Sequence, residues 1–350
     1  MFVYLSVFLA LAFAGLFVRV RTQQDWALGI FGIFLLLFMG TRYETGCDYG
    51  AYEARFRFQY DDPSYLSYLE REEPGFHLLN LLVHDLGLGY VWLNVFASLI
   101  FLVGVIRFVR LSPSPLLLFA LLFPVIMVQL GMSGIRQALA VSFLLQALVS
   151  FVQGQRIQTG LWILLGAQFH QSAYLFLPLA LMAGQKFSWI LAAASLAFLG
   201  PAAIFLLGER AEVYSDRYVE QIYGENASGG ALLRYALAIV PCVMFEVYKR
   251  RVRRILPRLY PLLRAFSLLT FAIGPLVFLS TVALHRMTYY VLPMTLMIFV
   301  CTVMVMPKQH KLSQRWLFFP AVTMAVYLVG WFTQSRHASA CYVPYDSFLF

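Results

Sequence analysis

The chain alternates between long apolar runs and short polar segments. The apolar runs reach roughly 17–25 residues, the length that a helix needs to cross the hydrocarbon core of a bilayer. About ten full transmembrane helices are expected, at residues 1–18, 26–40, 90–109, 116–130, 138–151, 188–207, 232–248, 262–282, 287–306 and 316–332. The pattern therefore predicts an all-α polytopic membrane protein, with one membrane-embedded domain over residues 1–350.

The run from Thr159 to Gly184 departs from this pattern. It has the length of a single span, but the polar sequence QFHQS, residues 168–172, lies at its centre. We interpret it as a broken or re-entrant pair of half-length helices that meet at this polar tip. A single crossing would place the basic run from Lys249 to Arg264 outside, against the positive-inside rule. The pair places that run in the cytoplasm and predicts both chain termini outside.

Two external segments are expected, at residues 41–89 and 208–230, and both should contain amphipathic helices. The first begins TRYETGCDYGAYEARF, in which Asp48 is a suitable N-cap for a helix that carries Tyr49, Tyr52 and Phe56 on one face. The following EPGFHLLNLLVHDLG makes about three turns, too few to span a bilayer. It should lie along the membrane surface.

Composition supports a membrane protein, because 61% of the residues are hydrophobic and only 12% are charged, about half the charged fraction of a soluble domain. The net charge of +9 comes from basic residues beside the ends of spans, where they set orientation, so no nucleic-acid partner is expected. Cys242 and Cys301 fall inside apolar runs. Cys47 and Cys341 could share the outer side, where a disulfide is permitted, but spacing alone does not fix a partner.

Arg136 is the most informative polar position. It lies in the first turn of a helix that opens at Ser133-Gly134, where the helix dipole disfavours a cation. An anion between the Arg136 guanidinium and the N-terminus of the helix would explain the arrangement, because helix N-termini and arginine both bind phosphate. Arg286 repeats the pattern at another helix start. The alternative is an arginine that reaches the lipid headgroups.

Other polar and aromatic residues should collect at the same membrane face, and such residues are functional candidates in a membrane protein. The further substrate-binding candidates are Arg42, Tyr49, Tyr52, Glu73, Gln137, Arg217, His285, Tyr289 and Tyr290. The Tyr49/Tyr52 face could stack on sugar rings or belong to an interfacial aromatic belt. His170 could line the site or be a core histidine. No metal or other cofactor is expected, because the acidic loop lacks a compact DxD and the histidines are scattered.

The segments TRYETGCDYGAY, EPGF, GIRQALA, FHQSAYLFLPL and HRMTYY, in this order, resemble the EpsG family of bacterial exopolysaccharide and O-antigen (Wzy-type) polymerases. The resemblance covers residues 42–290 and implies a GT-C-like enzyme of the bacterial inner (cytoplasmic) membrane. Such an enzyme would transfer a growing glycan from undecaprenyl pyrophosphate to the non-reducing end of a lipid-linked repeat unit at the periplasmic face. The implied partners are that lipid-linked oligosaccharide, the bilayer, and a flippase and chain-length regulator of the same pathway.

The expected mechanism is inverting glycosyl transfer. Asp48, or failing it His170, would take the acceptor hydroxyl proton as general base. Arg136 and Arg286, helped by Arg42 and Arg217, would neutralise the departing pyrophosphate.

Two other classes fit parts of the sequence. Gly131-Met132-Ser133-Gly134 matches the GxSG motif of rhomboid-like intramembrane serine proteases, with His170 or His285 as base, but so short a motif has a high false-positive rate. A lipid-linked glycan exporter would also need intramembrane charges. Many transporters carry inverted repeats, and the sequence shows none.

Overall fold

The computed structural model describes residues 1–58, 73–184, 229–278, 280–306 and 313–349, together with the single positions 67, 190, 193 and 197. The described part is almost entirely helical, as expected for an all-α protein. Most of the expected span at 188–207 and of the second external segment at 208–230 lies outside the described residues. The candidate Arg217 is among the residues outside them.

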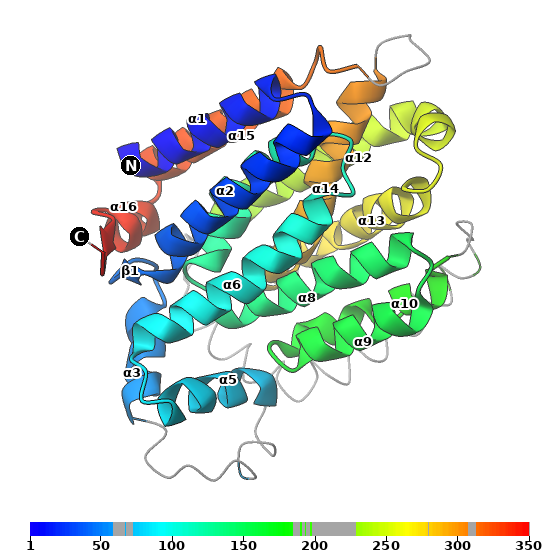
Figure 1. The fold of residues 1–350 in the computed structure, drawn as a ribbon. Helices are drawn as coiled ribbons and strands as arrows, with labels where there is room; N and C mark the ends of the chain where they lie inside the picture. The colour runs from blue at the N-terminus through cyan, green and yellow to red at the C-terminus, as the bar shows by residue number, and fades with distance from the viewer. Residues whose placement is uncertain are drawn as a thin grey trace. The chain divides into compact units, whose positions relative to one another are not determined.

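The chain forms two compact units, the first made of Met1–Gln146, Trp162–Ala173 and Phe318–Phe350. In Figure 1, α1 lies beside α15, α2 runs along α6, and the short helices α3 and α5 lie at the end of α6. The described helices that lie wholly or partly in this unit are α1 (Phe2–Phe17), α2 (Arg21–Gly40), α3 (Tyr49–Phe58), α5 (Pro74–Asp85), α6 (Tyr90–Val109), α7 (Pro115–Leu122), η1 (Phe123–Gly131), the first part of α8 (Ile135–Val152), the second part of α9 (Arg156–Ala167), α15 (Phe318–Gln334) and α16 (Arg336–Tyr342).

The helix expected at residues 116–130 changes type along its length. It starts as α7 with Pro115 in its first turn, where the missing N–H of proline is harmless. It continues as η1, a π-helix over Phe123–Gly131 that begins next to Pro124. π-helical turns are frequent at functional sites. Here the π-helix ends directly before Met132 and Ser133, the residues that contact the first external loop.

The second unit is made of Ala147–Leu161 and Tyr174–Leu317. Its long helices α12 (Gly229–Ile255) and α13 (Tyr260–Ala272) both pack against α14 (Thr281–Val305). The single helix expected at 262–282 is divided, because α13 ends before Gly274-Pro275 and a short 3-10 turn, η4 (Gly274–Phe278), follows. Helix α14 then begins at Thr281, directly after its N-cap Ser280, whose Oγ accepts the Ala283 N–H (3.2 Å).

Polar residues at the basic end of α12 form hydrogen bonds with α13 and α14 in this unit. Arg251 donates to the carbonyl oxygens of Val305 (3.3 Å) and Met306 (2.8 Å), which ends α14 with a cation at its negative pole. Glu246 accepts hydrogen bonds from Lys249 (2.8 Å) and from Arg264 on α13. The orientation role expected for the run from Lys249 to Arg264 stays a prediction.

The break expected between residues 159 and 184 is present, but only its first half is a half-length α-helix. Helix α9 (Arg156–Ala167) ends where the Gly166 carbonyl accepts the N–H groups of Phe169 (3.0 Å) and His170 (3.1 Å). The 3-10 turn η2 (Gln171–Phe176) and the one-turn helix α10 (Leu179–Met182) follow. The break therefore falls on the polar tip, whereas its depth in a membrane stays a prediction.

A short β-pair occurs in a chain for which the sequence predicts no strand. In β1 (Arg42–Tyr43) and β2 (Asp346–Ser347), Arg42 pairs with Ser347 and Tyr43 with Asp346 in antiparallel register. A two-residue pairing is too short to produce the alternation that indicates a strand. The pair brings the C-terminal segment to the first external loop.

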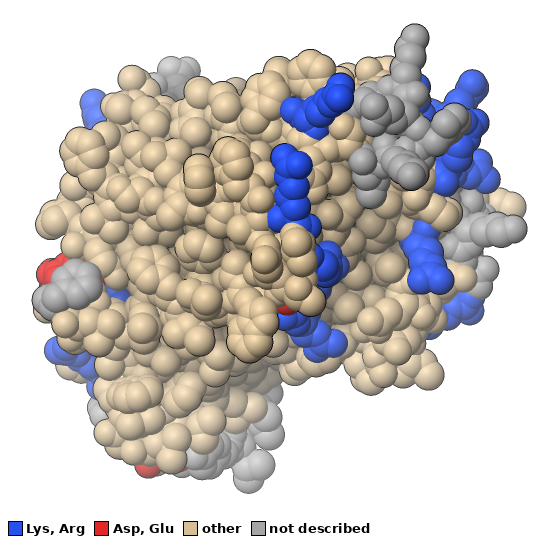
Figure 2. All heavy atoms as spheres, turned by 45° about the horizontal axis from the view of Figure 1, so that its top comes forward, with Lys and Arg blue, Asp and Glu red and all other residues tan. Residues whose placement is uncertain are grey.

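The outer surface of the helices is that of a membrane protein. Six of the described helices are long and apolar enough to cross a bilayer, and four shorter apolar helices accompany them. Large apolar side chains such as Trp26, Ile30 and Ile33 are exposed along α2, and most of the face in Figure 2 is uncharged. Lipid chains, not water, suit such a surface. The count of about ten full spans and the GT-C-like arrangement remain predictions.

Candidate functional site

The loop that follows α2 (residues 41–48), which the sequence predicts to begin the first external segment, is fixed against the start of α8. Gly46 has a φ of 109°, and a Cβ there would lie 2.0 Å from the Met132 carbonyl oxygen, so only glycine fits. The Gly46 N–H donates to the Cys341 carbonyl (2.7 Å), and the Asp48 N–H donates to Ser133 Oγ (3.3 Å). These contacts hold the exposed side chain of Asp48 beside the helix that carries Arg136.

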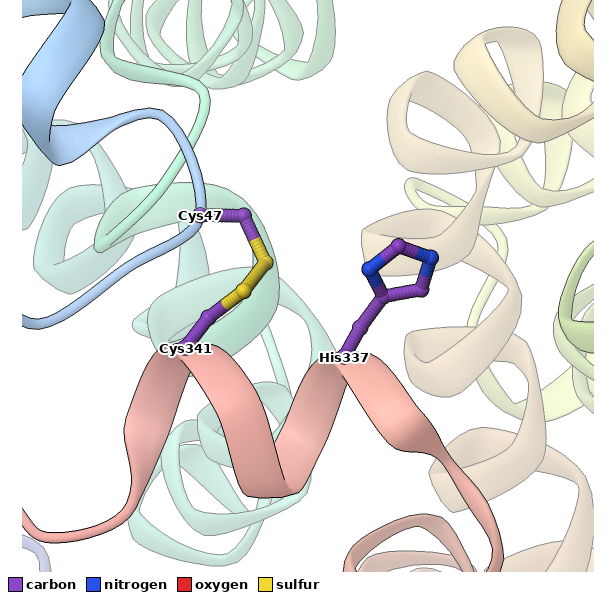
Figure 3. A group of neighbouring side chains, drawn as sticks. All are labelled: Cys47, His337 and Cys341. Atoms are coloured by element: carbon purple, nitrogen blue, oxygen red, sulfur yellow. A yellow bond between two sulfur atoms is a disulfide. The ribbon is translucent and has the colours of Figure 1, made fainter. Parts of the chain in front are cut away.

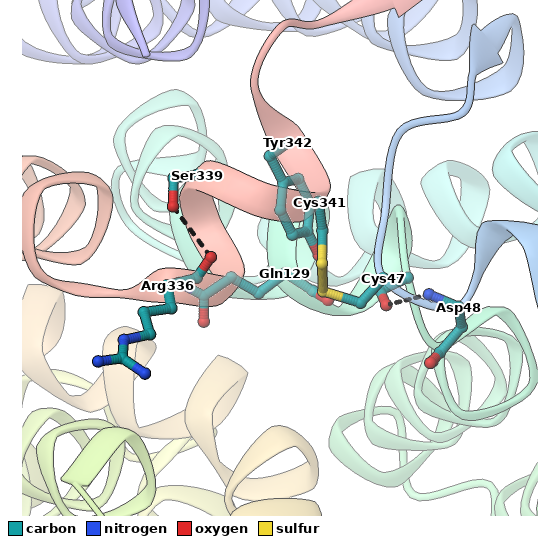
Figure 4. The surroundings of a disulfide bond; sticks show 8 residues. Cys47, Asp48, Gln129, Arg336, Ser339, Cys341 and Tyr342 are labelled. Atoms are coloured by element: carbon teal, nitrogen blue, oxygen red, sulfur yellow. Dashed lines mark hydrogen bonds between the residues drawn. A yellow bond between two sulfur atoms is a disulfide. The ribbon is translucent and has the colours of Figure 1, made fainter.

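A disulfide joins this loop to α16. Cys47 and Cys341 are bonded, with their Cα atoms 4.9 Å apart, and Figure 4 shows Asp48 on the loop directly after the bond. This settles the pairing that spacing left open. His337 lies beside the two sulfur atoms (Figure 3), and the three side chains have metal-ligand chemistry. The sulfur atoms are bonded to each other, however, so neither is a thiolate ligand in this structure.

Glu73 is the centre of a polar cluster in the first unit. Its buried carboxylate accepts Arg136 Nη1 at Oε2 (2.6 Å) and the Gln171 N–H at Oε1 (3.4 Å). The residue adopts a left-handed backbone (φ 59°), a conformation that costs a non-glycine residue about 1–3 kcal/mol. Glu73 thus connects the start of α5, the start of α8 and the broken-helix tip.

The turn after Glu73 makes a second connection to the tip. The Gly75 N–H donates to the Gln168 carbonyl (2.9 Å), and a Cβ on Gly75 would lie 2.9 Å from Gln168 Cβ. Phe169 is anchored in turn by stacking on Phe143 of α8, with ring centroids 5.2 Å apart. The EPG sequence therefore serves as a close-packing turn that holds the tip in place.

His170 and Ser172 interact within the tip. Ser172 Oγ lies 2.7 Å from His170 Nδ1, and the Ser172 N–H donates to the same nitrogen (3.4 Å). The ring of His170 is half-buried. Ser172 was not among the candidates from sequence, although its position two residues after a mid-segment histidine is the signal that would have identified it.

The two candidate tyrosines are packed inside the unit. Tyr49 meets the ring of Tyr90 edge-on (centroids 5.1 Å apart), and Tyr52 meets Phe76 (5.6 Å). Burial raises the pKa of Tyr49 to about 12 and also raises the pKa of Tyr52, against the opposing effect of the Arg136 charge. The hydroxyls are therefore protonated at neutral pH. A contact of either ring with a sugar stays a prediction.

Arg42 is a structural side chain in this loop. Its exposed fraction is 1%, and it donates to the backbone carbonyls of Thr45 (3.2 Å) and Met39. Burial lowers its pKa from the ordinary arginine value. It holds the chain between α2 and the disulfide, and the contact with pyrophosphate expected from the sequence stays a prediction. Gln137, in the first turn of α8, is also buried.

The remaining candidates lie on the first turns of α14 in the second unit. Arg234 of α12 donates to Tyr289 Oη (3.2 Å), and its guanidinium lies 5.6 Å from that ring's centroid. His285 meets the same ring edge-on (4.8 Å), and Arg286 is the next residue along the helix. Tyr290 packs on Phe176 (5.1 Å). Arg234 was missed from sequence, where a lone arginine in an apolar run was the available signal.

The apolar helices and the polar cluster at their ends define a multi-pass, all-α membrane protein. A model of the EpsG family matches residues 25–347, and the chain belongs to that family. No curated protein and no solved structure matches the chain.

Proposed function

We propose that the chain is a polysaccharide polymerase of the bacterial cytoplasmic membrane. It transfers a growing glycan from undecaprenyl pyrophosphate to the non-reducing end of a lipid-linked repeat unit at the outer face. Membership of the EpsG family supports polymer synthesis. The observation that carries the chemistry is the cluster in which Glu73 joins Arg136 to the His170 tip, beside the loop that presents Asp48. A flippase and a chain-length regulator are the expected partners.

Arg136 is the proposed contact for the lipid diphosphate. Glu73 holds one edge of its guanidinium, and 36% of the side chain remains exposed. A cation that is already oriented stabilises developing negative charge without reorganising during the reaction. Arg286 is proposed as a further anion contact, although it lies in the second turn of α14 and not at the helix start that the sequence suggested, because α14 begins at Thr281. The role expected of Arg217 belongs to this proposal as well.

Asp48 is the proposed general base. The acceptor hydroxyl oxygen attacks the anomeric carbon of the donor glycan while the bond from that carbon to the diphosphate oxygen breaks, which inverts the configuration. The hydroxyl proton passes to the Asp48 carboxylate, and the negative charge passes to the diphosphate beside Arg136. The lipid diphosphate is itself the leaving group, so the reaction needs no nucleotide sugar.

The direct test is polymerisation by the purified protein. With lipid-linked repeat units as the sole sugar source, we expect a ladder of products that carry integral numbers of repeats. Ser133→Ala should retain the ladder and slow its formation by less than about tenfold, because it removes one hydrogen bond that positions the Asp48 loop and no group that takes part in the reaction. A serine protease predicts loss of its activity with Ser133→Ala. An exporter predicts unpolymerised units that change sides of the membrane.

The disulfide allows the orientation to be tested in intact cells. We expect Cys47 and Cys341 to react with a membrane-impermeant thiol probe only after treatment with an impermeant reductant. The disulfide blocks both thiols until it is reduced, and the proposed orientation places both on the outer side. Arg254→Cys, at the exposed basic end of α12, is the matched control and should react only after permeabilisation. Cys242 and Cys301 are buried and should stay unlabelled. Labelling at position 254 in intact cells would contradict the proposed orientation.

A further inference from the structure

Two polar groups of one residue, a backbone N–H and a hydroxyl, lie against a single nitrogen of His170. The Ser172 N–H approaches Nδ1 at 3.4 Å and the Ser172 hydroxyl at 2.7 Å. A backbone N–H can only donate, so Nδ1 must present its lone pair. A hydrogen on Nδ1 would point at another hydrogen.

The tautomer of the ring follows from this contact. A neutral imidazole carries one N–H, and the hydrogen bond made by one nitrogen decides which nitrogen is protonated. With Nδ1 accepting, the hydrogen of His170 lies on Nε2. We propose that Ser172 is a positioning residue that holds His170 in the Nε2–H form, so that His170 donates a hydrogen bond to a charged oxygen of the substrate diphosphate. This inference rests on the proposed polymerase function.

The same contact opposes the alternative role of His170 as general base. Nε2 already carries its hydrogen, and proton uptake at Nδ1 would set the new N–H against the Ser172 N–H and force the Ser172 hydroxyl to change from donor to acceptor. The tip is tied to the Arg136 cluster, since Gln171, the residue between His170 and Ser172, donates its N–H to Glu73. The Nε2–H of His170 and the Arg136 guanidinium then both bind the substrate diphosphate. Removal of the proton from the acceptor is left to Asp48.

Amide substitutions separate the possible roles of His170. In His170→Gln the amide nitrogen reaches about as far as Nε2 and can donate, whereas in His170→Asn the amide lies near the place of Nδ1. We expect His170→Gln to polymerise within about tenfold of the wild-type rate, and His170→Asn and His170→Ala to lose about 100-fold, the effect of removing one preorganised donor. Equal loss in the Gln and Ala variants, with the Cys47–Cys341 bond intact as evidence of folding, would overturn the donor role. Near-normal polymerisation by His170→Asn would also contradict the donor role and would assign His170 a structural role.

A spectroscopic measurement tests the tautomer without any polymerase assay. In the full-length protein labelled with ¹⁵N-histidine, His170 is assigned by the signals that disappear in His170→Gln, and its ring proton is expected on Nε2. This result is independent of the reaction, so failure of the proposed function leaves it standing. A ring proton on Nδ1, or on both nitrogens at neutral pH, would refute the inference.

Substitution of Ser172 supplies the last arm. Ser172→Ala should lower polymerisation by up to about tenfold and shift part of the ring population to the other tautomer, because one donor to Nδ1 is lost. Ser172→Thr keeps the hydroxyl and should restore both readouts. Ser142→Ala is the matched control, since it removes a serine hydroxyl that donates to the Ile100 carbonyl (2.8 Å). An unchanged tautomer in Ser172→Ala, together with an unchanged rate, would contradict the positioning role.

Discussion

Polymerisation is expected to fall about 100- to 1,000-fold when Arg136 is replaced by alanine, the usual effect of removing an oriented group that stabilises transition-state charge. The lost guanidinium is the one that Glu73 holds at 2.6 Å, with part of the side chain exposed. Arg136→Lys should also be poor, because an ammonium cannot keep the contact with Glu73 and present a second planar edge. The rate of repeat addition by purified protein measures both effects.

Arg57→Ala is the matched control for this experiment. Arg57 also pairs with a glutamate, Glu53 (2.6 Å), but its side chain is mostly exposed on α3. Loss of such a surface pair should change the rate by less than about threefold. Because Arg136→Ala also leaves the buried Glu73 carboxylate unpaired, Glu73→Gln/Arg136→Ala should be compared with it for folding. Wild-type polymerisation by a folded alanine variant would remove Arg136 from the site.

Asp48→Asn is expected to slow polymerisation about 10²- to 10⁴-fold while donor and acceptor lipids still bind, since an amide cannot take the acceptor proton. Asparagine caps a helix about as well as aspartate, so a capping role at the start of α3 predicts a near-normal rate. The backbone contact of Asp48 with Ser133 is unaffected by the change. Single-turnover rates with saturating lipid substrates separate the chemical step from binding.

Glu44→Gln is the control for Asp48→Asn. Glu44 is an exposed acid in the same loop, four residues before Asp48, and the substitution removes one negative charge there too. It should leave the rate within about threefold, because the Glu44 side chain is exposed and glutamine can keep its contact with Tyr43. Equal losses in the two variants would assign the effect to the charge of the loop. A normal rate in Asp48→Asn would place the proton acceptor on another residue.

The parts of the fold that sequence predicts are those with a local signal. Five polar or aromatic residues in the centre of an apolar run predict a break, and the helix breaks at residues 168–172. The spacing of Tyr49, Tyr52 and Phe56 predicts one helical face, which is buried in α3. The same spacing cannot tell whether that face meets protein or substrate, because either partner selects aromatic residues at helical intervals.

The contacts that build the site have no local signal. Glu73 and Arg136 are 63 residues apart, and Glu73 precedes Pro74, a position that suggests a helix cap. The left-handed backbone at Glu73 is disfavoured by the local conformational preference of glutamate. Contacts with residues distant in sequence stabilise it, so local sequence does not predict it. The Cys47–Cys341 pair and the β1–β2 pair likewise join the two ends of the chain. Such pairings depend on how the helices pack, and no window of sequence contains them.

The disulfide between Cys47 and Cys341 also sets an order of events during folding. The two cysteines are separated by 294 residues, so the bond cannot form until the chain has been synthesised as far as α16, after every described helix from α1 to α15. A chain whose N-terminal and C-terminal helices had not packed together would leave Cys47 and Cys341 apart and unbonded. Because Cys47 adjoins Asp48, the loop proposed to carry the chemistry is covalently fixed only after the two ends of the first unit have come together.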